Sequence, residues 1–192
     1  DYINNRAGVD SVLRARANEC APFENVYTLA LRGLHDRAMN ASNDMADRKQ
    51  MLQDALMAQR KMLIDATGKR GEDIPQAFTP YKEVLDVYDE GLELPDDVTI
   101  IWPDDNYGYM KRLSSPKEQK RSGRSGVYYH SSYLGKPHDH LWMNTTSPTL
   151  MYEELRKAYD MTADRIWLLN AGDIKSCEFA VDFFLSMAYD ID

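Results

Sequence analysis

The sequence is short of the features that define several large classes of protein. It has only two cysteines in 192 residues, Cys20 and Cys177, which lie far apart and without the spacing of metal ligands. They are therefore interpreted as buried thiols, with a disulfide possible but without support from the sequence. No window approaches the roughly 18 consecutive apolar residues of a membrane span, so no membrane partner is expected.

Positive charge is also scarce. The chain has 23 Lys and Arg against 31 Asp and Glu, which gives a net charge of −8, and Lys and Arg form no cluster. A polyanionic partner such as nucleic acid is therefore not expected. No nucleophilic serine or cysteine stands out, and Gly33, Gly126 and Gly135 are isolated rather than part of a phosphate-binding loop. These absences disfavour esterases, proteases and nucleotide-binding proteins.

What the sequence does contain is an alternation of short apolar, β-branched runs with helical patterns. Strands are expected over residues 26–31, 74–78, 98–102, 126–130 and 165–170. Helices are expected over residues 43–65, 81–90, 149–160 and 176–189. Strands separated by helices are typical of parallel β/α units.

The predicted fold class is therefore α/β, with parallel β/α units that form most of a TIM-like (β/α)8 barrel. A closed barrel typically needs roughly 250 residues, so residues 1–192 are expected to be a single partial domain, truncated to about five strands. The start at Asp1, without methionine or signal peptide, is interpreted as a cut into a longer multidomain chain. A small doubly wound domain is the alternative.

Polar residues follow every expected strand, at the end where barrel loops converge on active sites. In chain order they are Arg32, His35, Asp36, Tyr81, Lys82, Glu83, Asp104, Asp105, Asn106, Tyr107, Tyr128, His130, Tyr133, Asn170, Asp173 and Lys175. Five such groups in succession favour one functional site. The plainer alternatives are helix capping by the aspartates, ion pairing of Arg32 and Lys82 within the scaffold, and packing of Tyr107 and Tyr109 over the sheet edge.

The run VYYH indicates what kind of ligand this site would bind. Alternation along a strand places Tyr128 and His130 on one face and Tyr129 on the other. Aromatic rings, a histidine and carboxylates suit a sugar, whose CH faces stack on rings while its hydroxyls form hydrogen bonds. His138 and His140 in KPHDHLW are weak evidence for a metal, so neither a metal nor another cofactor is expected.

Four blocks of the sequence resemble the catalytic barrel of glycoside hydrolase family 115, the xylan α-1,2-glucuronidases. They are LRGLHD, TPYKEVLDVYDEGLELPDDVTIIWPDDNYGY, GVYYHSSYLGKPHDHLWMNTTSP and IWLLNAGDIKSCEFAVDFF. The resemblance implies hydrolysis of α-1,2-linked (4-O-methyl-)D-glucuronic acid side chains of glucuronoxylan, with inversion. It also implies a periplasmic or extracellular, homodimeric full-length enzyme, of which this fragment alone would be inactive. A non-catalytic carbohydrate-binding α/β module is the alternative.

The resemblance also assigns roles to individual residues. It implies that Asp36 and Glu83 are the catalytic carboxylates, without indicating which is the acid and which the base. An inverting pair is typically about 6.5–9.5 Å apart. The implied substrate-binding residues are Arg32, Tyr81, Asn106, Tyr128, His130 and Tyr133.

Overall fold

The computed structural model describes residues 2–33, 37–39, 43–133 and 143–192. The chain divides into two compact units, Asp1–Val98 and Thr99–Asp192, which are considered one at a time. Among the described residues, no helix combines the length and the apolar character that crossing a bilayer requires. Cys20 and Cys177 are free thiols, of which only Cys177 is fully buried.

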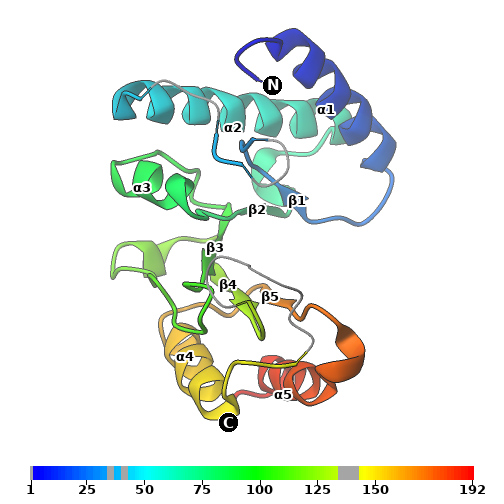
Figure 1. The fold of residues 1–192 in the computed structure, drawn as a ribbon. Helices are drawn as coiled ribbons and strands as arrows, with labels where there is room; N and C mark the ends of the chain where they lie inside the picture. Colours follow the sequence, from blue (N-terminus) through cyan, green and yellow to red (C-terminus); the bar gives the residue numbers. More distant parts are fainter. Residues whose placement is uncertain (1, 34–36, 40–42, 134–142) are drawn as a thin grey trace. The chain divides into compact units, whose positions relative to one another are not determined.

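The first unit pairs two short parallel strands and surrounds them with helices (Figure 1). Its elements in chain order are α1 (Arg6–Cys20), β1 (Tyr27–Thr28), α2 (Met45–Thr67), β2 (Gln76–Phe78) and α3 (Glu83–Asp89). Strands β1 and β2 run in parallel, with Tyr27 opposite Gln76. Helix α1 was not predicted from the sequence. It packs along α2, and its apolar row is narrow: Val9 and Leu13 are half-buried, and Ala17 is its only buried residue.

Helix α2 shows how local sequence sets the ends of an element. Its first turn is capped by the Asp44 carboxylate, which accepts hydrogen bonds from the backbone N–H groups of Ala46 and Asp47 at 2.8 and 3.2 Å. The helix ends at Gly68, whose φ of 67° is left-handed and therefore suits glycine. The predicted helix over residues 43–65 is thus confirmed within two residues at each end.

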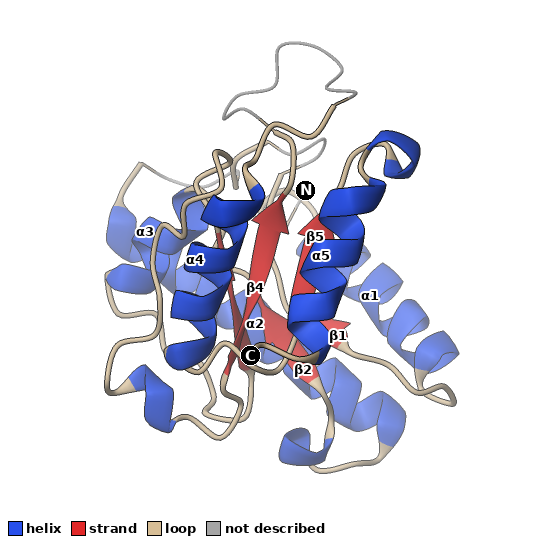
Figure 2. Ribbon diagram, turned by 90° about the horizontal axis from the view of Figure 1, so that it is seen from below, coloured by secondary structure: helices blue, strands red, loops and turns tan. Residues whose placement is uncertain are grey.

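The second unit contains three parallel strands covered by two helices. These are β3 (Thr99–Pro103), β4 (Ser125–His130), α4 (Pro148–Asp160), β5 (Trp167–Asn170) and α5 (Glu178–Tyr189). Ile101 lies opposite Gly126 between β3 and β4, and Val127 lies opposite Trp167 between β4 and β5. Helices α4 and α5 lie side by side over β4 and β5 (Figure 2). The core between them consists of Val127, Tyr129, Met151, Leu155, Ala158, Ala163, Ala180, Phe184 and Met187.

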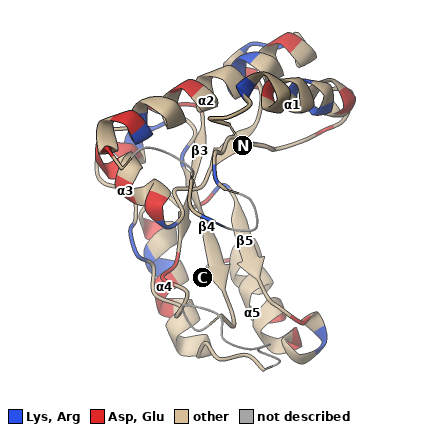
Figure 3. Ribbon diagram, turned by 45° about the horizontal axis from the view of Figure 1, so that its top comes forward, with Lys and Arg blue, Asp and Glu red and all other residues tan. Residues whose placement is uncertain are grey.

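Charged side chains are concentrated on the helices and on the loops, and the strands carry almost none (Figure 3). Every residue of β3 is buried, as expected for a strand covered on both faces. All five predicted strands are present, and the strands within each unit run in parallel. The α/β class with parallel β/α units of the TIM-barrel kind is therefore confirmed. The prediction that residues 1–192 form a single domain is not tested by these contacts.

Candidate active site

In the first unit, three predicted site residues come together: Arg32, Tyr81 and Glu83. The Nε and Nη2 atoms of Arg32 each donate a 3.4 Å hydrogen bond to the carboxylate of Glu83, and both side chains are one-fifth exposed. The guanidinium carbon of Arg32 lies 5.3 Å from the centre of the Tyr81 ring. Glu83 also accepts a 3.0 Å hydrogen bond from the backbone N–H of Met39. Glu83 is thus fixed from two sides.

The backbone between Tyr81 and Glu83 is strained. Lys82 has a φ of 51° and a ψ of −122°, a conformation that costs a residue with a Cβ about 1–3 kcal/mol. Its Nζ lies 4.9 Å from the centre of the Tyr81 ring. Strain of this kind is kept where the surrounding structure imposes it, and it clusters at functional sites. The strain at Lys82 therefore indicates that the positions of Tyr81 and Glu83 are important for function.

The alternatives for this unit are partly decided. The alternative ion pair of Arg32 within the scaffold is present, formed with Glu83, and the role of Arg32 in binding substrate stays a prediction. Asp36, the other predicted catalytic carboxylate, lies outside the described residues, as does His35. The separation expected between Asp36 and Glu83 is therefore not tested.

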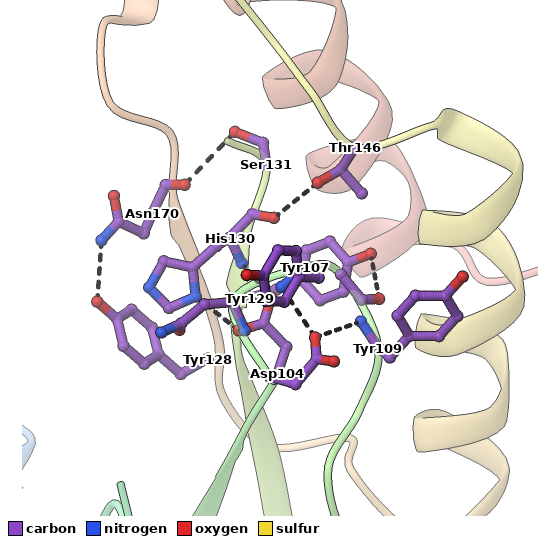
Figure 4. Close-up of polar contacts among 12 residues, drawn as sticks. Asp104, Tyr107, Tyr109, Tyr128, Tyr129, His130, Ser131, Thr146 and Asn170 are labelled. Atoms are coloured by element: carbon purple, nitrogen blue, oxygen red, sulfur yellow. Dashed lines mark hydrogen bonds and ion pairs between the residues drawn. The ribbon is translucent and has the colours of Figure 1, made fainter. Parts of the chain in front are cut away.

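In the second unit, the side chain of His130 is held by Asp104. The Nδ1 atom of His130 lies 2.6 Å from Oδ1 of Asp104, and the backbone N–H of His130 donates to Oδ2 at 2.9 Å. Both side chains are almost fully buried. Figure 4 shows this pair at the C-terminal ends of β3 and β4, where each residue ends or follows its strand. Asp104 was among the polar residues predicted to follow the strands, but its pairing with His130 was not predicted from the sequence.

Two tyrosines stand beside the imidazole. The ring centres of Tyr128 and Tyr133 lie 4.6 and 4.7 Å from that of His130. Asn170, at the end of β5, donates a 3.0 Å hydrogen bond from Nδ2 to the hydroxyl of Tyr128. Tyr129 instead faces the core, where its ring packs against Phe184. The predicted division of VYYH between two faces is therefore confirmed.

The loop after β3 is a tightly bonded turn. Asp105 accepts hydrogen bonds from the backbone N–H groups of Tyr107 and Tyr109 at 2.8 and 3.1 Å, and its own N–H donates to the carbonyl of Tyr109 at 2.8 Å. Asn106 and Gly108 both have left-handed φ values, 68° and 94°. Asp104 and Asp105 therefore stabilise this turn rather than capping a helix. Tyr107 and Tyr109 are more than half exposed rather than packed over the sheet edge.

The turn is anchored to the core by Tyr129. Its buried hydroxyl donates a 2.8 Å hydrogen bond to the carbonyl of Gly108. Burial, followed by the nearby carboxylate of Asp104, raises the pKa of this hydroxyl far above its usual range, so the proton is kept at every physiological pH. A Cβ at Gly108 would lie 2.8 Å from the Thr146 methyl group and 3.0 Å from the Tyr129 hydroxyl. Position 108 therefore requires glycine, because a side chain would collide with these neighbours and because the left-handed φ disfavours any other residue.

Within the part of the chain that the structure describes, no three His, Cys, Asp or Glu side chains form a group that could hold a metal ion. His138 and His140 lie outside that part. Asp173, another candidate helix cap, precedes a short 3-10 helix without a capping hydrogen bond from its side chain. The described site residues can therefore contact a ligand through hydrogen bonds, aromatic ring faces and carboxylates.

Parallel β/α units with such side chains at the strand ends define an α/β protein of the TIM-barrel kind. The sequence matches Glycosyl hydrolase family 115 over residues 1–192. A solved structure of a family GH115 4-O-methyl-α-glucuronidase, BtGH115A, with specificity for decorated arabinogalactans, is similar to the chain with a TM-score of 0.95 and 44% identity. The chain belongs to glycosyl hydrolase family 115, as its sequence motifs predict.

The match covers 100% of this chain and 25% of the solved chain. This chain therefore spans about a quarter of the length of that relative. The comparison with curated proteins gave no match.

Proposed function

We propose that this chain is part of the catalytic domain of an α-glucuronidase that removes (4-O-methyl-)D-glucuronic acid from a decorated plant polysaccharide. The observation that carries this proposal is the 44% identity to a 4-O-methyl-α-glucuronidase over the full length of the chain. Further support comes from Glu83, whose carboxylate is oriented by Arg32 and by the Met39 N–H. Oriented carboxylates are what glycoside hydrolysis requires.

The proposed mechanism is hydrolysis with inversion at the anomeric carbon. One of Asp36 and Glu83 protonates the leaving oxygen, while the other activates a water molecule on the opposite face of the sugar. Arg32 supplies positive charge for the uronate carboxylate, a role that suits the planar guanidinium fork. Tyr81, Asn106, Tyr128, His130 and Tyr133 bind the uronic acid by ring contacts and hydrogen bonds.

We propose α-1,2-linked side chains of glucuronoxylan as the substrate, with decorated arabinogalactan as the alternative. Decorated arabinogalactan is considered as a substrate because the similar solved enzyme has specificity for it. A homodimeric, periplasmic or extracellular full-length enzyme is proposed on the family resemblance alone.

The proposed function is tested by incubating the complete enzyme with each polysaccharide and following the product by proton NMR from the first minutes. Inversion of an α-linkage predicts that free glucuronic acid appears first as the β anomer and then mutarotates. Early release of the α anomer would contradict inversion. Binding of both polysaccharides without any release would favour the carbohydrate-binding module instead.

The exposed rings of Tyr107 and Tyr109 are proposed to contact sugars next to the uronic acid. Replacing either tyrosine with Ala in the complete enzyme should raise KM for the polysaccharide about 2- to 10-fold, because an aromatic stacking contact contributes about 0.5–1.5 kcal/mol. The matched control is Tyr152→Ala, which removes a half-exposed ring from α4. An equal loss in the control, or an unchanged KM in both tyrosine variants, would contradict this extension of the site.

A further inference from the structure

The carboxylate of Asp104 is surrounded by donors. Its Oδ1 faces Nδ1 of His130 at 2.6 Å and accepts a 3.1 Å hydrogen bond from the backbone N–H of Asn106. Its Oδ2 accepts the 2.9 Å hydrogen bond from the backbone N–H of His130. The residue is only 3% exposed. Figure 4 shows Asp104 beside the imidazole of His130.

This arrangement defines which imidazole nitrogen carries a hydrogen. An ionised carboxylate only accepts hydrogen bonds, so the 2.6 Å contact requires a hydrogen on Nδ1 of His130. That holds for the neutral Nδ1–H form of the ring and for the charged form. Nε2 has no hydrogen-bond partner among the described residues, and the ring centres of Tyr128 and Tyr133 lie 4.6 and 4.7 Å from that of the imidazole. Nε2 is thus the ring nitrogen left to meet a ligand.

We propose that Asp104 is a positioning residue that fixes both the tautomer and the orientation of His130, so that Nε2 contacts a hydroxyl or carboxylate oxygen of the bound uronic acid. The identity of the ligand rests on the proposed function, whereas the tautomer does not. Asp104 itself is buried behind the imidazole and acts through it. The pairing therefore couples the turn after β3, which begins at Asp104, to the end of β4.

Asparagine is nearly the same size as aspartate, but it cannot replace Asp104 here. If its oxygen takes the place of Oδ1, its NH2 group faces the backbone N–H of His130. In the reverse orientation, the NH2 group faces both Nδ1 and the backbone N–H of Asn106, and Nδ1 can pair with it only by losing its hydrogen. Each orientation sets a donor against a donor, so the Asp104→Asn variant should disturb the ring.

The test is magic-angle-spinning ¹⁵N NMR on the complete enzyme labelled with ¹⁵N-histidine, recorded at alkaline pH. Subtracting the spectrum of His130→Gln isolates the His130 signals, whose shifts show which nitrogen is protonated. The wild type should show Nδ1–H, and Asp104→Asn should show a mixture or Nε2–H. The matched control is Asp105→Asn, since the exposed neighbour bonds only the turn. It should leave the His130 tautomer unchanged.

Kinetics with glucuronoxylan oligosaccharides provide the second measurement. Asp104→Asn should lower kcat/KM about 10- to 100-fold, the usual effect of losing a hydrogen bond to a charged group. An Nε2–H form in the wild type would overturn the positioning role, even if the Asp104→Asn variant did not fold. An altered tautomer with unchanged kcat/KM would overturn the contact with the uronic acid. A wild type with Nδ1–H but without activity would refute the proposed function and leave the positioning role intact.

Discussion

Glu83→Gln in the complete enzyme is expected to lower the rate of glucuronic acid release about 10²- to 10⁴-fold, the range that general acid or base catalysis contributes. Glutamine keeps the shape of the side chain and an oxygen that accepts the hydrogen bond from Met39. It cannot donate or accept the proton that either catalytic role requires. The measurement is the initial rate of glucuronic acid release from aldouronic oligosaccharides.

The control for this substitution lies at the other end of the same short helix. Glu90 is the exposed residue that follows α3, so Glu90→Gln removes the same charge just beyond the helix and should leave the rate unchanged. Thermal melting of both variants separates a catalytic loss from a folding defect. A rate for Glu83→Gln within twofold of the wild type would remove Glu83 from the mechanism.

The elements that the sequence predicted well are those with strong local signals. Helix α2 has an aspartate cap and a terminal glycine, and α4 begins at Pro148, a favoured first position. Helix α1 has weaker signals: Asn5 caps it and Val9, Leu13 and Ala17 form a narrow apolar row, but its first turn carries no acidic residue. Its position is set by packing against α2, which lies more than twenty residues later in the chain. Tertiary contacts of this kind leave little trace in a local pattern.

In the candidate site, too, the features that depend on local sequence were predicted and those that depend on tertiary structure were not. Placing polar residues after each strand requires only the strand ends, and alternation of side chains correctly separated Tyr129 from Tyr128 and His130. Pairing Asp104 with His130 requires the register between two strands, because Pro103 lies opposite Tyr128 and the next residue then reaches the end of β4. The Met39 N–H that orients Glu83 belongs to a loop, whose backbone geometry the sequence does not specify.

The pairing of β4 with β5 makes a strong prediction about Gly126, which lies in β4. A Cβ at this position would lie 1.9 Å from the carbonyl oxygen of Ile166 and 2.9 Å from its carbonyl carbon. These are backbone atoms, and the same oxygen accepts the 2.9 Å hydrogen bond from Val127 that begins the pairing of β4 with β5. A methyl group could therefore be accommodated only by separating the two strands.

Gly126→Ala is accordingly expected to lower the free energy of unfolding by about 3 kcal/mol or more, at or beyond the upper end of the usual cost of overpacking. Urea denaturation of the complete enzyme, followed by tryptophan fluorescence, measures this change. The comparison is Gly68→Ala, where φ is 67° but nothing lies within 4 Å of the added Cβ. There only the left-handed backbone is penalised, by about 1–2 kcal/mol. If Gly126→Ala lowered the free energy of unfolding less than Gly68→Ala does, the close approach of β4 to Ile166 would be wrong. The register between β4 and β5, which places Asn170 beside Tyr128, would then be wrong as well.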